Sequence, residues 1–170
     1  MSVPGWLGQT PLHLPVPDRP GAVLAGRVEP FSAAELEAAW SEWSSYSPLL
    51  ADVLLVLART GLRWDEARRL TVADAGPDHL RVRGPRQRCV PVAVRIRPIV
   101  ERLLAGRDDD EVLFTTSTGE PLSRTDVLDR LHWDRTGRGR RLVDLRHTAA
   151  FLWLAEGACP AAVREWMGGR

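Results

Sequence analysis

The chain has 170 residues, of which 44% are hydrophobic and 26% charged, so it has the size and composition of one globular domain with a full core. Its formal net charge is +1, which gives no overall argument for a polyanionic partner. No apolar run is long enough to span a membrane, the first residues lack the layout of a signal peptide, and the two cysteines match no metal-binding or disulfide pattern, so we expect a cytoplasmic protein without a membrane partner.

The N-terminal part of the chain differs in composition from the rest. Residues 1 to 30 are rich in proline and glycine and show no amphipathic period, which predicts an extended arm or linker. We therefore place a single domain at residues 31 to 170. Ser32 followed by Glu35 forms a capping-box pattern, and the apolar period after it predicts a first helix that ends near Ser44.

Two further helices and a hairpin follow in chain order. A helix is predicted from Pro48 to Arg59, because proline is favoured in a first turn and Gly61 supplies a stop. A short third helix is predicted at Trp64 to Leu70. The segments Leu80 to Arg83 and Arg88 to Val92 alternate between apolar and charged residues around a glycine-proline turn, which predicts a β-hairpin.

The second half of the chain is mainly helical in pattern. Its predicted elements are a helix at Val94 to Leu104, a strand at Val112 to Phe114, and helices at Ser123 to Trp133, Val143 to Glu156 and Pro160 to Met167. This order predicts an α+β fold that is mainly α, with a small antiparallel sheet made of the hairpin and one short strand.

Positive charge is concentrated in one part of the sequence. The window from Leu80 to Arg102 holds seven arginines and one acidic residue. Lysine is absent from the chain, so each of these cations is a guanidinium, which suits bidentate contact with phosphate. Arg83, Arg86 and Arg88 in the predicted hairpin are therefore candidate DNA contacts. The alternative is that the arginine content reflects the codon bias of a GC-rich genome.

Two motifs that are distant in the sequence each carry an arginine: Thr60-Gly61-Leu62-Arg63 and Leu145-Arg146-His147-Thr148. With the hairpin and the segment Gly119-Glu120-Pro121-Leu122-Ser123 between them, they resemble in order the catalytic domain of the tyrosine recombinases, the phage integrases and their relatives. The resemblance implies that fold, duplex DNA as a partner and other recombinase protomers as further partners. It implies no metal, no cofactor and no small-molecule substrate.

The resemblance also implies roles for individual residues. Arg63 and Arg146 match the two arginines that grip the scissile phosphate in this family, Glu66 matches a supporting acid, and His147 follows the second arginine as a partly buried supporting residue. Without that context, Arg63 is more typical of a helix surface and Glu66 of a first helical turn. We expect Arg63 and Arg146 to converge on one solvent-accessible pocket, within about 10 Å, and the hairpin tip to point toward it.

The sequence departs from the family pattern at the positions that move protons or attack phosphorus. Val143 stands where the family has a histidine, the hairpin offers arginine where the family has a lysine, and Gly169 stands where another histidine is typical. The single tyrosine, Tyr46, lies between two N-terminal helices. The chain ends before the helix on which the family's nucleophile would sit.

We therefore predict a DNA-binding, integrase-like domain that belongs to DNA integration or site-specific recombination. It keeps the two phosphate-gripping arginines and lacks the means to cut DNA by itself. Two alternatives remain open at this point: a non-catalytic DNA-binding regulatory module, and a decaying remnant of a mobile element without a selected role.

Overall fold

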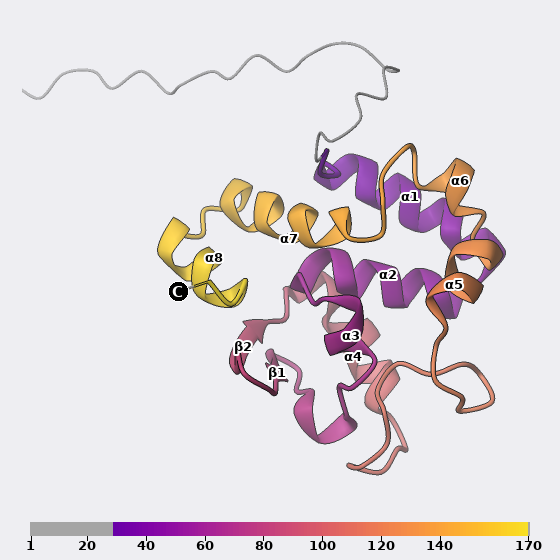
Figure 1. Cartoon of the computed structure of the whole chain (residues 1–170), viewed down its shortest axis with the longest axis horizontal. Coiled ribbons are helices and arrows are strands. Elements are labelled where there is room, and N and C mark those ends of the chain that lie inside the picture. Colours follow the sequence, from indigo (N-terminus) through magenta and orange to yellow (C-terminus); the bar gives the residue numbers. More distant parts are fainter. Residues whose placement is uncertain (1–28, 170) are drawn as a thin grey trace, which may run out of the picture.

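The described fold begins with a capped helix. The computed structural model describes residues 29 to 169, and the predicted arm at residues 1 to 30 lies outside them except for its last two residues. Helix α1 (Ala33–Tyr46) opens the domain (Figure 1). Its capping box is confirmed, because the Ser32 hydroxyl accepts from the Glu35 backbone N–H at 3.2 Å and the Glu35 carboxylate accepts from the Ser32 N–H at 2.8 Å.

Helix α2 (Pro48–Thr60) is the central element of the core. Every residue from Leu50 to Thr60 is buried, as expected for a helix that is apolar on most sides. Helices α1 and α7 (Asp144–Ala155) pack against it (Figure 1). The backbone N–H of Phe31 donates to the hydroxyl of Thr148 at 3.0 Å, which ties the start of the domain to α7.

The predicted hairpin is confirmed. Strand β1 (His79–Val82) pairs antiparallel with β2 (Arg88–Pro91), and Leu80 lies opposite Val90. Both of these apolar residues are fully buried, because alternate positions of a strand face the same side and here that side faces the core. The domain is therefore mainly helical with a small antiparallel sheet, as predicted.

The predicted strand at Val112 to Phe114 is not formed. In the described part of the chain the sheet has two strands, and Val112 makes only an isolated bridge to Thr71. The guanidinium of Arg107 donates to the carbonyls of Val112 and Leu113 at 2.6 and 2.7 Å. These carbonyls would otherwise accept from a neighbouring strand, so an arginine takes the place of a ladder partner.

The helix predicted from Ser123 to Trp133 is interrupted. It breaks at His132, which has φ +50°, and the break lets Trp133 stack on Trp43 with ring centroids 5.5 Å apart. Core packing of a large aromatic residue thus overrides the helical pattern. The remaining helical elements are α3 (Trp64–Ala67), 3₁₀ turns at Val72–Asp74 and Val94–Ile96, α4 (Arg97–Leu104), α5 (Arg124–Arg130), α6 (Trp133–Thr136) and α8 (Pro160–Trp166).

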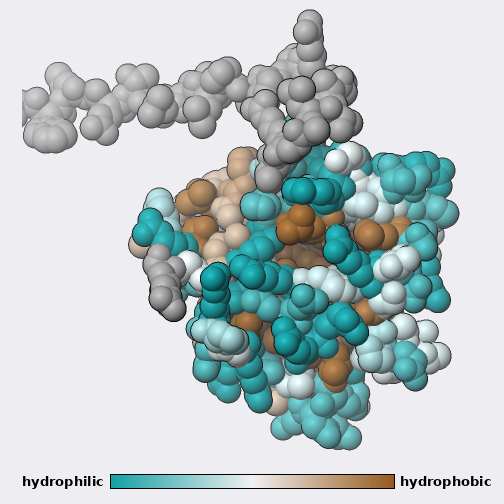
Figure 2. All heavy atoms as spheres, viewed as in Figure 1, coloured by the Kyte–Doolittle hydropathy of each residue, from teal (hydrophilic) through white to brown (hydrophobic). Residues whose placement is uncertain are grey.

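One surface of α7 is apolar. Val143, just before the helix, and Phe151 and Leu154 within it are exposed, and their spacing puts them on one side. Figure 2 shows apolar atoms gathered over the C-terminal half of α7, whereas the surface over α3 and the hairpin is largely hydrophilic. Three apolar side chains are thus exposed on the side of α7 away from the core, where the exposed His147 also lies.

Candidate nucleic-acid interface

A tight corner between α2 and α3 positions Arg63. Gly61 ends α2 with φ +61°, a left-handed conformation that glycine adopts without strain. A Cβ at Gly61 would lie 3.2 Å from the sulfur of Met167 and 3.3 Å from the Cβ of Ala149. The corner places the exposed Arg63 directly before α3 (Trp64–Ala67), which is shorter than the sequence predicted.

An ion pair between Glu66 and Arg88 joins α3 to β2. Nη1 of Arg88 donates to Oε1 of Glu66 and Nη2 donates to Oε2, each at 2.8 Å. Nε of Arg88 donates to the carbonyl of Trp166, the last residue of α8, at 2.6 Å. The side chain of Arg88 is only 4% exposed. Although Arg88 was predicted to contact DNA, its donors are directed at acceptors within the protein.

Arg146 connects α7 to two other segments. Its guanidinium donates to the backbone carbonyl of Gly61 at the end of α2 and to that of Met167 just after α8. A guanidinium has five N–H donors, so these two bonds leave three for a ligand. Arg146 is also partly exposed. The residue is therefore held in place by the protein while part of it stays accessible.

Charge and burial shift two pKa values in this region. The pKa of Arg146 is lowered to about 10, first by burial and then by the positive charge of Arg88. Arg63 and Arg86 add to the lowering, and Glu66 opposes it. Burial acts to raise the pKa of Glu66, but hydrogen bonds from Arg88 and from the Arg63 backbone N–H outweigh it and hold this pKa below its ordinary value.

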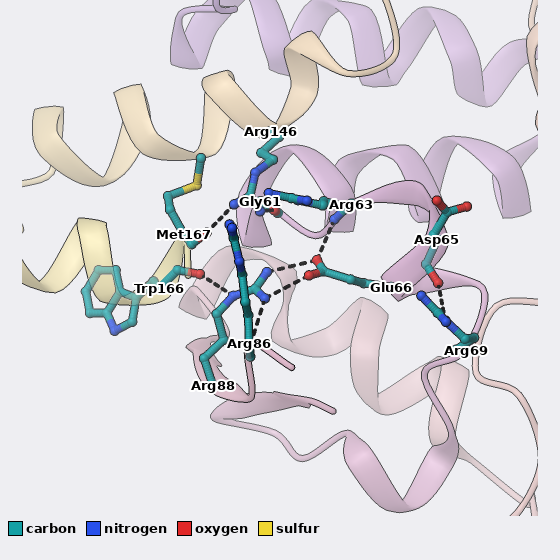
Figure 3. Close-up of polar contacts among 10 residues, drawn as sticks. All are labelled: Gly61, Arg63, Asp65, Glu66, Arg69, Arg86, Arg88, Arg146, Trp166 and Met167. Atoms are coloured by element: carbon teal, nitrogen blue, oxygen red, sulfur yellow. Dashed lines mark hydrogen bonds and ion pairs between the residues drawn. The ribbon is translucent and has the colours of Figure 1, made fainter. Parts of the chain in front are cut away.

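The side chains of Arg63, Arg86, Arg88 and Glu66 all lie near that of Arg146, and we call these five residues the arginine cluster. Figure 3 shows the guanidinium groups of Arg63 and Arg86 reaching toward that of Arg146. The contributing segments are the start of α3, the hairpin and α7, so the tip of the hairpin does point toward the two motif arginines. The cluster contains four guanidinium groups and one carboxylate, which leaves an excess of positive charge suited to phosphate.

Three residues considered from the sequence lie apart from the cluster. Arg83 donates from Nε to the carboxylate of Asp74 at 2.6 Å. His147 was expected to be partly buried, but it is exposed and forms no hydrogen bond within the described residues, because the helix turns it about 100° from Arg146. Tyr46 ends α1 with its ring 4.8 Å from that of His132, next to α6, and Figure 1 shows α6 and α8 at opposite ends of the domain.

Backbone carbonyls hold the cluster together, and no sequence pattern singles them out. The acceptors belong to Gly61, Trp166 and Met167. Every residue has a backbone carbonyl, so residue types carry no signal for which ones meet an arginine. Gly61 was singled out in the sequence as a helix end and as part of the first motif, but neither pattern indicates that its carbonyl accepts from Arg146.

Two other kinds of feature are absent from residues 29 to 169. Within residues 29 to 169, no group of three or more His, Cys, Asp and Glu side chains is placed to hold a metal ion. None of the helices in this part of the chain combines the length and the hydrophobicity needed to cross a bilayer.

Comparison with known proteins identifies a family. The sequence profile described as the phage integrase family matches residues 30–169. Among curated protein sequences, none matches the chain.

Solved structures share the fold at low sequence identity. XerA recombinase has a TM-score of 0.66 and 20% identity over 94% of this chain and 59% of its own. The Tn1549 transposon integrase in complex with circular intermediate DNA has a TM-score of 0.66 and 20% sequence identity, over 84% of this chain and 57% of its own. A lambda integrase tetramer bound to a Holliday junction has a TM-score of 0.66 and 16% sequence identity, over 84% of this chain and 47% of its own. The chain thus spans about half to three-fifths of these similar proteins.

Proposed function

Because the chain belongs to the phage integrase family, we propose that it is a DNA-binding, integrase-like domain whose arginine cluster holds a backbone phosphate of duplex DNA. The observation that carries this proposal is the convergence of Arg63, Arg86 and Arg146 from three separate elements (Figure 3). Planar guanidinium donors match the geometry and charge of phosphate oxygens, and several of them around one phosphate fix its position.

The members of the cluster have different proposed roles. Arg63 and Arg86 are exposed and contact the phosphate directly. Arg146 contacts it with the donors that Gly61 and Met167 leave available. Glu66 and Arg88 act as positioning residues, because their mutual pair is largely buried and links α3 to β2. Arg83 contributes to DNA binding from outside the cluster, and His147 supports Arg146 only through their shared helix.

We further propose that this chain binds DNA without cutting it. Arginine is a very poor general acid because it holds its proton so tightly, so the cluster stabilises charge but does not protonate a leaving oxygen. The chain's single tyrosine, Tyr46, packs near α6, away from the cluster. Cleavage therefore needs a nucleophile that residues 29 to 169 do not bring to the arginines.

Other parts of the proposal concern context. The proposed domain begins at residue 31, and the arm predicted at residues 1 to 30 lies outside the described residues except for its last two. Other recombinase protomers are proposed partners, since the similar lambda integrase is a tetramer on a Holliday junction. The proposed place of action is the cytoplasm.

Binding is tested by fluorescence anisotropy with a labelled duplex over a series of salt concentrations. We expect non-specific affinity of roughly 10⁻⁴ to 10⁻⁶ M at physiological salt. Arg63→Gln and Arg86→Gln should each weaken binding and lower the salt slope by about 1. Arg124→Gln, an exposed arginine at the start of α5, is the matched control. Equal effects of all three variants would remove the cluster from the proposed interface.

Cleavage is tested separately with a nicked suicide substrate that traps a covalent protein–DNA adduct. We expect no adduct from wild type or from Tyr46→Phe. An adduct that disappears in Tyr46→Phe would show that this tyrosine is the nucleophile. An adduct that persists would reveal a different nucleophile, and either result would overturn the claim of binding without cleavage.

A further inference from the structure

A second feature lies beside the arginine cluster and plays no part in the proposed phosphate contact. A cleft of about 320 Å³ runs between the segment after α3 and the hairpin. Its lining includes the buried side chains of Leu70 and Val82 and the exposed guanidinium residues Arg69 and Arg83. The volume is at the lower end of the range for small-molecule pockets, about 300 to 1,000 Å³, so it suits a single small ring system.

The cleft and the arginine cluster share a wall. Glu66 lines the cleft and pairs with Arg88 in the cluster. Figure 3 shows Arg69 and Arg88 on opposite sides of Glu66. The hairpin contributes to both features, because Arg83 lines the cleft while Arg86 reaches toward Arg146. The cleft and the arginine cluster therefore adjoin each other at Glu66.

We infer that this cleft is a subsite for one unpaired nucleobase of the DNA whose phosphate the arginine cluster holds, an inference that rests on the proposed function. A base has flat apolar faces and a polar edge. Guanidinium planes such as those of Arg69 and Arg83 stack on such faces, and the buried Leu70 and Val82 offer apolar contact. The lining thus matches a base better than it matches a second phosphate.

Acceptors in the cleft add a preference among bases. Asp74 lines the cleft and is buried. Its Oδ1 accepts from Nε of Arg83 at 2.6 Å, and its Oδ2 accepts from the hydroxyl and the backbone N–H of Thr71 at 3.0 and 3.4 Å. Each carboxylate oxygen can accept more than one hydrogen bond. Adenine, cytosine and guanine carry an exocyclic amino group with two N–H donors, whereas an unpaired thymine offers only its single ring N3–H. We therefore expect the subsite to favour amino-bearing bases.

The inference predicts a preference among DNA structures. A base inside a perfect duplex must be unpaired and unstacked before it can enter the cleft, and this cost is smallest where the base is already unpaired. A duplex with one bulged base should thus bind more tightly than the same duplex without the bulge. The gain should be larger for a bulged adenine than for a bulged thymine.

The experiment compares three duplexes: fully paired, with a bulged 2-aminopurine as an adenine analogue, and with a bulged thymine. We expect the 2-aminopurine duplex to bind about tenfold more tightly than the paired one, with a rise in its fluorescence as the base leaves the stack. Arg69→Gln should abolish this preference. Arg68→Gln removes the same charge from an exposed neighbour outside the cleft and should keep the preference.

The outcomes separate the subsite from the phosphate site. Equal affinity for paired and bulged DNA, or a preference that survives Arg69→Gln, would overturn the nucleobase subsite while duplex binding through the cluster still stood. A preference lost equally in Arg68→Gln and Arg69→Gln would also overturn it, because general charge would then be the cause. Failure of the wild-type protein to bind any of the three duplexes would instead overturn the proposed function itself.

Discussion

Arg88 holds Glu66 through two parallel hydrogen bonds of 2.8 Å, and Glu66 in turn accepts the backbone N–H of Arg63 at 2.8 Å. The side chains of Arg88 and Glu66 are 4% and 16% exposed. This chain of contacts runs from the second strand of the hairpin to the first residue of the motif helix. It fixes the backbone of Arg63 while leaving that residue's own guanidinium in solvent.

The Glu66–Arg88 pair should be important for stability. Removing one partner of a buried ion pair leaves the other charge without compensation and costs about 3 to 5 kcal/mol. We therefore expect Glu66→Ala to lower the free energy of unfolding by about that amount, measured by urea denaturation with tryptophan fluorescence. Glu101→Ala, at an exposed position of α4, should change it by less than about 0.5 kcal/mol. Similar effects of the two substitutions would contradict a structural role for the pair.

The same pair predicts how stability depends on pH. Burial acts to raise the pKa of Glu66, but hydrogen bonds from Arg88 and from the Arg63 backbone N–H outweigh it and hold this pKa below its ordinary value of 4.5. Its ionised form therefore stabilises the fold above pH 4.5, and that contribution is lost as the pH falls through the lowered folded-state pKa. The stability difference between wild type and Glu66→Gln should be constant near pH 7 and shrink below pH 4.5. If this difference instead grew below pH 4.5, the pKa of Glu66 in the folded state would be raised and not lowered.

Local sequence patterns predicted the parts of the fold that local chemistry determines. Ser32 and Glu35 cap α1 by hydrogen bonds to each other. Leu80 and Val82 alternate with charged residues and so define one face of a strand. The residues involved lie within a few positions of one another, so a local sequence pattern is enough to predict these features. The pattern at residues 112 to 114 failed because its carbonyls bond to Arg107, a side chain whose position no local pattern indicates.

The sequence predicted the two motif arginines and the direction of the hairpin tip, but not the separate contacts of each hairpin arginine. The two motifs pointed to Arg63 and Arg146, and the structure brings both into the arginine cluster. The different contacts of the hairpin arginines were not predictable, because Arg83, Arg86 and Arg88 have similar neighbours in the sequence. Their contacts are set by tertiary packing. Arg88 points into the core and donates to Glu66 and to the Trp166 carbonyl, whereas Arg83 donates to Asp74.

The corner at Gly61 should tolerate no side chain. Its φ of +61° costs a non-glycine residue about 1 to 2 kcal/mol, and a Cβ would also crowd Met167 and Ala149 at 3.2 and 3.3 Å. Gly61→Ala should therefore lower the free energy of unfolding by more than the backbone term alone. Gly106→Ala is the matched control, since Gly106 has φ +69° and open space around its Cβ. Equal losses in the two variants, measured by urea denaturation, would mean that the close approach to Met167 has no energetic weight.

Replacing Arg146 by lysine should separate its structural contacts from its charge. Lysine keeps the positive charge but presents it on one nitrogen at the end of a flexible stem, so it cannot bridge the carbonyls of Gly61 and Met167 as the guanidinium does. Hydrogen bonds from a charged group contribute about 1.5 to 3 kcal/mol each. Arg146→Lys should therefore loosen the end of α8, and the backbone amides of that helix should exchange with deuterium faster than in wild type.

The DNA-binding readout of the same variant gives the second half of this prediction. The salt slope of binding counts cations near phosphate, so it should change little in Arg146→Lys and fall by about 1 in Arg146→Ala. The affinity should nevertheless drop in Arg146→Lys, because a single ammonium cannot match a bidentate phosphate contact. Arg124→Lys controls for a change of arginine to lysine at an exposed site. If Arg146→Lys leaves both amide exchange in α8 and DNA affinity at wild-type values, then neither the two carbonyl contacts nor the planar geometry of Arg146 matters for the proposed interface.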